Sequence, residues 1–200
     1  MTSIITGDII NSRDSAPKQW LSALKTVLNT YGNSPKDWEI YRGDSFQIEL
    51  KPELALQVAI QLKATLKQFK TTDIRLAIGI GDKSYTSEKI TEANGTAFIN
   101  SGECFEQLKK TTLAIKTPFN TFDTQLNLML DLALLTMNNW SPVSSLIIKT
   151  ALEHPQHNQK QLAKLLEKSQ SNISEGLKRG GYDEILKLIQ FYNSQIQDLW

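Results

Sequence analysis

The first 117 residues alternate between short apolar runs and stretches with helical periodicity. Runs rich in β-branched and other apolar residues predict strands near positions 3–5, 38–41, 46–50, 74–80 and 113–115. Apolar residues that recur every three or four positions predict helices over 16–31, 53–69 and 96–108. The predicted order of elements is therefore β-α-β-β-α-β-α-β.

This order favours an α+β fold. It is typical of a ferredoxin-like palm, in which helices cover one face of an antiparallel sheet. A hairpin is expected around Arg42-Gly43-Asp44-Ser45, because alternating apolar and polar residues flank this turn on both sides. The first strand is expected to end in a turn at Thr6-Gly7-Asp8. We therefore expect a palm domain over residues 1–117.

After residue 117 the chain is expected to be purely helical. Residues 118–123 lack periodicity and are expected to form a connector. Nearly every residue of 126–137 is apolar, so we expect a helix that is buried either between domains or between subunits. This connector and helix occupy 118–140, and an all-α domain is expected over 141–200.

Residues 158–181 have the pattern of a helix-turn-helix. Asn158 and Ser169 stand where helix N-caps are preferred. Five apolar residues recur at positions that would face inward: Leu162, Ala163, Leu166, Ile173 and Leu177. The polar residues left outside are expected to contact DNA bases and phosphates: Lys168, Gln170, Ser171, Asn172, Ser174, Lys178 and Arg179.

The alternative for this segment is a helical hairpin with a solvated polar face. Glu167 and Lys168 stand where the tight turn often carries glycine and an apolar residue. The whole chain has a net charge of only +1, so attraction to DNA would have to come from a local patch. Residues 159–181 carry five basic and two acidic side chains, which is a small local surplus of positive charge.

The composition is that of a cytoplasmic protein. Hydrophobic residues make up 40% of the chain, and no apolar run approaches the roughly 20 residues that a membrane span requires. The N-terminus lacks the pattern of a signal peptide. A single cysteine, Cys104, excludes an internal disulfide framework, and we expect it to be a small core residue.

Two aspartates are candidates for a metal site. Asp8 follows the first strand, and Asp44 lies in the hairpin turn between the next two strands. If these strands are neighbours, the paired carboxylates could hold Mg²⁺, which in turn binds triphosphate oxygens. Gly7 and Gly43 precede the two aspartates and would let the backbone approach a ligand. Alternatively, each aspartate could have a purely structural role: Asp44 could hydrogen-bond to the backbone of its own turn, and Asp8 could cap the loop that leads into the first helix.

Four motifs resemble those of class III nucleotidyl cyclases, in the same order along the chain. TGDIINS at 6–12 resembles their first metal-binding motif, and RGDSFQ at 42–47 resembles their Gly-Asp hairpin and the GGDEF turn of diguanylate cyclases. IRLAIGIG at 74–81 and GTAFINSG at 95–102 are similar to their following strand and helix start. The resemblance implies nucleotide contacts from Gly7, Ile9, Gly43, Arg75 and Asn100.

The whole chain looks most like the SatD family, in which such a domain precedes a helical, DNA-binding-like C-terminus. Two positions depart from the cyclase pattern. Ile40 stands where cyclases often place a base-selecting lysine, and Cys104 stands where their transition-state arginine is expected. The resemblance thus implies nucleotide binding without fast turnover, because the charge that stabilises transferring phosphates is missing.

We weigh three hypotheses for the function. The first is a transcription regulator that binds DNA as a homodimer, with a palm domain that senses a nucleotide and Mg²⁺ or supports dimerisation; the helix at 126–137 is one candidate interface. The second is an enzyme, either a nucleotidyl cyclase or a nucleotidyltransferase, that uses a nucleoside triphosphate and Mg²⁺. The third is an interaction protein in which both sites are vestigial.

Overall fold

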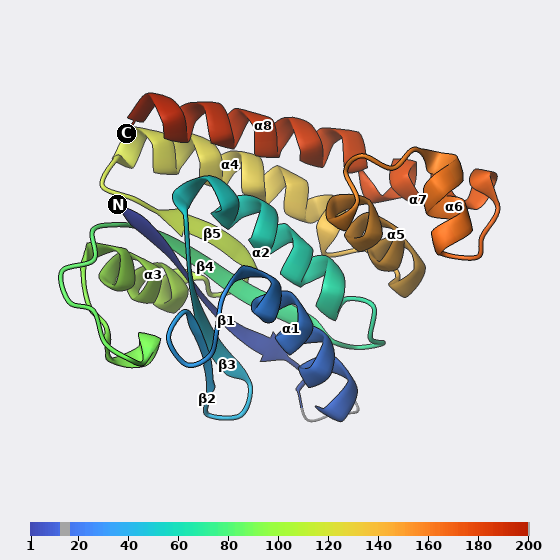
Figure 1. Cartoon of the computed structure of the whole chain (residues 1–200). Coiled ribbons are helices and arrows are strands. Elements are labelled where there is room, and N and C mark those ends of the chain that lie inside the picture. The colour runs from blue at the N-terminus through green and yellow to red at the C-terminus, as the bar shows by residue number, and fades with distance from the viewer. Residues whose placement is uncertain (13–16, 200) are drawn as a thin grey trace.

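The computed structural model describes residues 1–12 and 17–199, which form one mixed five-stranded sheet and eight α-helices (Figure 1). The strands are β1 (Thr2–Ile10), β2 (Trp38–Tyr41), β3 (Ser45–Leu50), β4 (Asp73–Gly81) and β5 (Leu113–Lys116). The helices of the first half are α1 (Pro17–Tyr31), α2 (Pro52–Leu66), a 3-10 turn η1 (Ile90–Glu92) and α3 (Thr96–Gln107). Those of the second half are α4 (Asn120–Met137), α5 (Pro142–Glu153), α6 (Gln159–Leu165), α7 (Gln170–Gly180) and α8 (Tyr182–Leu199).

The strand order across the sheet is β2-β3-β1-β4-β5. β1 lies between β3 and β4 and pairs antiparallel with both, while β4 and β5 are parallel. The predicted α+β class and the predicted order of elements are confirmed. The expectation of a wholly antiparallel sheet is wrong, because β5 returns through the α3 crossover and runs in the same direction as β4.

Helices cover both faces of the sheet. α1, α2 and α4 lie over the face that carries Ile5, Phe46 and Ile78, whereas α3 lies over the opposite face (Figure 1). On the α3 face the hydroxyl groups of Thr6 and Ser101 are joined by a 2.5 Å hydrogen bond. The expectation that helices would cover only one face therefore fails at α3.

One hydrophobic core runs from the sheet into the C-terminal helices. Its buried residues come from β1, β3, β4 and β5, from α1 and α2, and from α4, α5 and α8. Polar contacts join the same elements: Gln61 on α2 donates to Glu153 on α5 at 3.1 Å, and the Tyr192 hydroxyl on α8 donates to the Pro52 carbonyl at 2.5 Å. Both C-terminal contacts converge on α2, which is buried along most of its length.

The bounds of β1 and α4 differ from the sequence expectations. β1 continues to Ile10, so Thr6, Gly7 and Asp8 lie inside the strand and not in a turn. α4 begins at Asn120, within the stretch that was expected to be a connector. The predicted helix over 16–31 includes Ala16 and the predicted all-α domain over 141–200 includes Trp200, and both residues lie outside the described residues.

Glycine is required where α3 crosses β4. A Cβ added to Gly79 would lie 2.1 Å from the Ser101 backbone nitrogen and 2.3 Å from the Ala97 carbonyl oxygen, and neither backbone atom can move without displacing α3. We predict that Gly79→Ala lowers the free energy of unfolding by about 3 kcal/mol, measured by urea denaturation.

The matched control is Gly102→Ala, within α3. A Cβ added there meets nothing within 4 Å. Alanine is the better helix former, so this variant is expected to gain roughly 0.5–1 kcal/mol. Equal losses of stability in the two variants would contradict the tight α3–β4 contact.

Candidate functional site

Asp8 lies next to Arg75 on the face of the sheet that α3 partly covers. The strand register places Asp8 opposite Arg75 on β4 and opposite Ser45 on β3. The Arg75 Nε donates to Asp8 Oδ1 at 2.9 Å, and the terminal guanidinium nitrogen pairs with Asp8 Oδ2. The hydrogen bond to Asp8 raises the pKa of Arg75, and the guanidinium lies 5.4 Å from the Phe105 ring centroid. Asp8 is therefore the carboxylate of a two-point ion pair.

Asp44 is brought to the same end of the sheet by the β2–β3 hairpin. Tyr41 pairs with Ser45, which leaves a three-residue loop that ends at Asp44. Gly43 adopts a φ of 92°, a conformation that favours glycine, so the turn itself accounts for this residue. The Asp44 carbonyl accepts from the Ile9 N–H at 3.1 Å, and its Oδ2 accepts from the Ser12 hydroxyl at 2.7 Å. The fold thus brings the segments of the two aspartates together.

The two carboxylates have different partners in this structure. Both oxygens of Asp8 are engaged by Arg75, whose charge neutralises the carboxylate. Among residues 1–12 and 17–199, no group of three or more His, Cys, Asp or Glu side chains could hold a metal ion. Mg²⁺ at Asp8 would have to displace the guanidinium, and its remaining ligands would come from Asp44, from water or from a bound phosphate.

The other candidate nucleotide contacts are spread over the sheet. Gly7 has a packing role, since a Cβ there would lie 2.6 Å from the Phe46 ring. The Ile9 side chain is buried in the core beneath the helices. Asn100 donates to the Ile80 carbonyl at 2.8 Å, five residues along β4 from Arg75, which corresponds to about 17 Å. Gly7, Ile9 and Gly43 adjoin the two aspartates along the chain, so Asn100 is the candidate that lies away from the aspartate end of the sheet. Among the candidates at that end, Arg75 brings a charged side chain.

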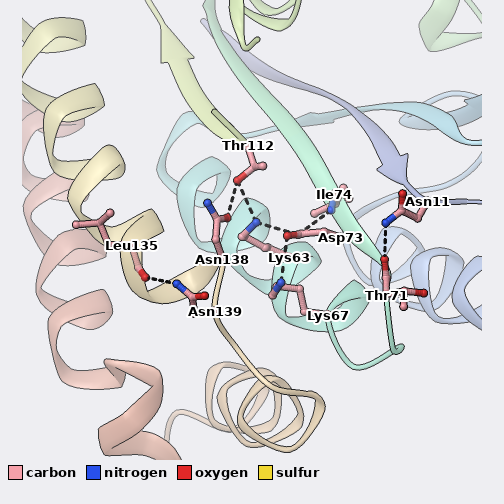
Figure 2. Close-up of polar contacts among 10 residues, drawn as sticks. All are labelled: Asn11, Lys63, Lys67, Thr71, Asp73, Ile74, Thr112, Leu135, Asn138 and Asn139. Atoms are coloured by element: carbon pink, nitrogen blue, oxygen red, sulfur yellow. Dashed lines mark hydrogen bonds and ion pairs between the residues drawn. The ribbon is translucent and has the colours of Figure 1, made fainter. Parts of the chain in front are cut away.

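A buried cation was missed by sequence reasoning. Lys63 interrupts the apolar stripe of α2, and its side chain is completely buried. Its Nζ donates to Asp73 Oδ1 at 2.9 Å and to the Thr112 hydroxyl at 3.1 Å (Figure 2). Burial lowers the pKa of Lys63, and the adjacent Asp73 carboxylate offsets part of this effect. A lysine in an otherwise apolar helical stripe was the only signal for this site.

The Lys63 network links the sheet to the helices that follow it. Thr112 precedes β5 and its hydroxyl donates to Asn138 Oδ1 at 2.9 Å, at the C-terminal end of α4 (Figure 2). Asp73, at the start of β4, also accepts from Lys67 at 3.1 Å. Asp73 pairs with Ile10 in the strand register, two residues beyond Asp8. Polar contacts therefore connect the region next to the aspartates with the end of α4.

Short helices α6 and α7 are capped as the sequence predicts. The Asn158 side chain accepts from the Lys160 and Gln161 N–H groups at 3.0 Å, and the Gln161 side chain returns a capping-box bond. The Ser169 hydroxyl accepts from the Asn172 N–H at 3.1 Å. The five residues predicted to face inward all belong to or pack against one cluster with α5: Leu162, Ala163, Leu166, Ile173 and Leu177.

The turn between α6 and α7 has the geometry that a glycine would normally supply. Glu167 adopts a φ of 52°, and the Lys168 N–H donates to the Ala163 carbonyl at 2.9 Å, as in a Schellman C-cap. Glu167 departs from the glycine that such a turn often carries. The backbone makes the expected turn despite this residue.

α7 packs closely on α5 and presents its polar side to solvent. A Cβ on Gly176 would lie 2.3 Å from Ile147 Cδ1, and one on Gly180 would lie 2.6 Å from Ile148 Cδ1. The Trp140 indole N–H donates to the Gly180 carbonyl at 2.9 Å. The candidate DNA contacts are exposed, apart from a half-buried Lys168: Gln170, Ser171, Asn172, Ser174, Lys178 and Arg179.

Comparison with protein-family models assigns the chain to a family. A family model described as the SatD family matches residues 2–191, nearly the whole length. The chain belongs to the SatD family. Comparisons with curated proteins and with solved structures found no match.

Two further properties of this SatD-family chain bear on the site. Burial raises the pKa of the Cys104 thiol to about 12, so Cys104 is a protonated core residue at neutral pH, as expected, and supplies no charge where cyclases place an arginine. In the described part of the chain, no helix is both long and apolar enough to cross a bilayer.

The energetic cost of the left-handed conformation in the α6–α7 turn can be tested at Glu167, which is an exposed residue. A residue with a Cβ is strained at this φ, whereas glycine is not. We predict that Glu167→Gly raises the free energy of unfolding by about 1 kcal/mol. Glu167→Ala retains a Cβ and is expected to change it by less than about 0.5 kcal/mol. Urea denaturation of both variants measures the difference, and equal effects would contradict the proposed cost of this conformation.

Proposed function

We propose that this SatD-family chain is a DNA-binding transcription regulator that acts as a homodimer. In this proposal α6 and α7 form a helix-turn-helix, and α7 is the recognition helix. The observation that carries it is the division of α7 into two faces: Ile173, Gly176 and Gly180 are buried, while the polar residues between them are exposed. Such a helix can enter the major groove while its other face stays packed on α5.

The geometry of the α6–α7 unit supports this proposal. The first turn of α7 exposes Gln170, Ser171 and Asn172, whose short polar side chains suit contacts to base edges. Its last turn exposes Lys178 and Arg179, which suit contacts to phosphates. Two glycines on its buried face, Gly176 and Gly180, let α7 lie close to α5, which fixes the orientation of the exposed face.

The N-terminal half would then be a ferredoxin-like palm with a regulatory role. The β1-α1-β2-β3-α2-β4 unit with strand order β2-β3-β1-β4 supports this fold assignment. Its aspartate end combines a guanidinium, Arg75, with polar groups from the β1 end and the hairpin. A nucleotide phosphate is the ligand that a bidentate arginine recognises well, so we propose nucleotide sensing there.

The enzyme alternative, a nucleotidyl cyclase or nucleotidyltransferase with Mg²⁺, gains less support. Such chemistry needs Asp8 free to bind a metal ion, but Arg75 occupies both of its oxygens. Cys104 offers no charge to the transferring phosphates. We therefore propose binding at this end of the sheet without rapid turnover.

DNA binding can be tested by fluorescence anisotropy with double-stranded genomic fragments over a range of salt concentrations. We predict an affinity that falls with salt, because basic residues displace counterions from phosphates. The double variant Lys178→Ala/Arg179→Ala should bind more weakly and should reduce the slope of log K against log salt by about 2, close to one unit per lost contact.

The control removes the same charge elsewhere. Lys18→Ala/Lys25→Ala takes two exposed lysines from α1 and should leave both affinity and slope nearly unchanged. Absence of salt-dependent binding in the wild-type protein would refute the proposed function. A double variant at α7 that behaves like the α1 control would refute the assignment of α7.

Nucleotide sensing has a separate test by calorimetric titration with ATP, GTP, CTP and UTP, each with and without Mg²⁺. We predict binding of a nucleoside triphosphate that Arg75→Gln weakens at least 10-fold. Lys83→Gln is the control, because Lys83 forms a comparable ion pair with Glu49 at the far end of the sheet. No binding would refute the sensor, and product formation that Asp44→Ala abolishes would favour the enzyme alternative.

A further inference from the structure

Helix α4 has two apolar stripes, and only one of them is buried in the core of the chain. The inner stripe is buried in the core: Phe122, Leu126, Leu130, Leu134 and Met137. The outer stripe consists of Leu128, Leu132 and Leu135, whose residues are 63%, 61% and 70% exposed. We call these three residues the leucine ridge. Of the two expected modes of burial, between domains or between subunits, packing within one chain accounts only for the inner stripe.

The leucine ridge differs from the other exposed apolar residues of the described chain. Apart from Met129, which lies on α4 and lines the groove described below, those are dispersed along the chain: Met1, Leu54, Tyr85, Ile99, Val143 and Leu165. Single exposed apolar residues are common on monomers. The ridge instead repeats leucine at intervals of four and three residues, which is the spacing of a helix seam that packs against another helix.

A groove lies beside the ridge, between α4 and α8. Its volume is about 690 Å³ and its lining includes Leu132 of the ridge itself. Buried or half-buried apolar side chains form much of the lining: Ala133, Ile185, Leu188 and Phe191. Lys178, Arg179, Lys187 and Glu184 also contribute to it, from the end of α7 and from α8. We call this feature the α4–α8 groove.

We propose that a second copy of this chain docks on this face, with the leucine ridge of each copy in the α4–α8 groove of the other. This inference deepens the proposed function, since it names the interface of the expected homodimer. The leucine ridge and the α4–α8 groove adjoin on one surface of the chain. A single twofold axis therefore places the ridge of each copy in the groove of the other copy. An isologous contact of this kind closes after two copies.

Charge supports a second copy as the occupant. Asp131 is exposed on α4 between Leu128 and Leu132, and the groove carries Lys187, an exposed basic side chain that the proposed DNA contacts do not use. A twofold contact therefore brings the partner's Asp131 to the groove that carries Lys187, twice per dimer. Complementary charges at the rim set the register and speed association.

The size of the face is sufficient for a dimer. α4 and α8 have 18 residues each. Each helix is thus about 27 Å long, and a layer of two helices about 20 Å wide offers a footprint of roughly 540 Å² per copy. Two footprints reach about 1,100 Å², which exceeds the roughly 1,000 Å² expected of a specific interface.

The experiment measures the mass of the full chain in solution, without DNA, by light scattering and sedimentation. We predict a dimer that persists in 1 M NaCl, because burial of the leucines does not depend on charge. Leu132→Glu should convert it to a monomer, since this residue belongs to both ridge and groove. Leu128→Glu/Leu135→Glu should do the same while leaving the groove lining intact.

Ile99→Glu is the matched control, because Ile99 is 52% exposed on α3 and the variant adds the same charge. It should remain a dimer. Circular dichroism and thermal unfolding should show that all variants stay folded. A wild-type monomer at every concentration, or a dimer that survives both ridge variants, would overturn the proposal. The readout contains no DNA, so failure of the dimer and failure of DNA binding are distinguished.

Discussion

The structure depends on the burial of α2 on two sides. This helix packs against the sheet on one side and against α5 and α8 on the other, and eleven of its fifteen residues are buried. A helix surrounded in this way must be apolar nearly all round. Gln61, Lys63 and Thr65 are the polar exceptions among its buried residues. The charge of Lys63 is tolerated because Asp73 and Thr112 provide partners. The same contact ties the start of β4 and the segment before β5 to α2.

Because α2 is shared, the two proposed sites belong to one packed body. Asp73 anchors Lys63 and pairs with Ile10, close to the Asp8–Arg75 ion pair. The Thr112 hydroxyl donates to Asn138, which extends the network to the end of α4. Two residues later, the Trp140 indole N–H donates to the carbonyl of Gly180, the last residue of α7. A ligand that moves the β1–β4 end therefore acts on elements in direct contact with the proposed recognition helix. This continuity is a physical basis for regulation, provided that the two ends adopt two arrangements.

Local features were predictable from the sequence because local rules govern them. The caps at Asn158 and Ser169, the hairpin around Gly43 and the inward residues of α6 and α7 follow from propensity and spacing. The order of strands and helices also followed from periodicity. The family assignment came from motifs spread along the chain, and the family match over residues 2–191 agrees with it.

Features that depend on distant residues were not predictable. Gly7 resembled a ligand-binding glycine, but the Phe46 ring on β3 fills the space beside it. The parallel pairing of β5 arises because the α3 crossover returns the chain to the edge beside β4, and periodicity does not report which strands become neighbours. The burial of Lys63 depends on a carboxylate ten residues away and on a hydroxyl forty-nine residues away. Contacts of this kind are set by tertiary packing, which overrides local propensity.

The leucine ridge and the modest charge of α7 have a common consequence. With five basic and two acidic side chains over residues 159–181, one copy offers few phosphate contacts, and the chain as a whole carries only one net positive charge. Electrostatic affinity for DNA grows with the number of phosphates that are neutralised. Two copies joined through α4 would double that number, and the second half-site would be bound at a high effective concentration. In the proposed regulator, apolar burial at the ridge thus supplies the affinity that the charge of a single recognition helix lacks.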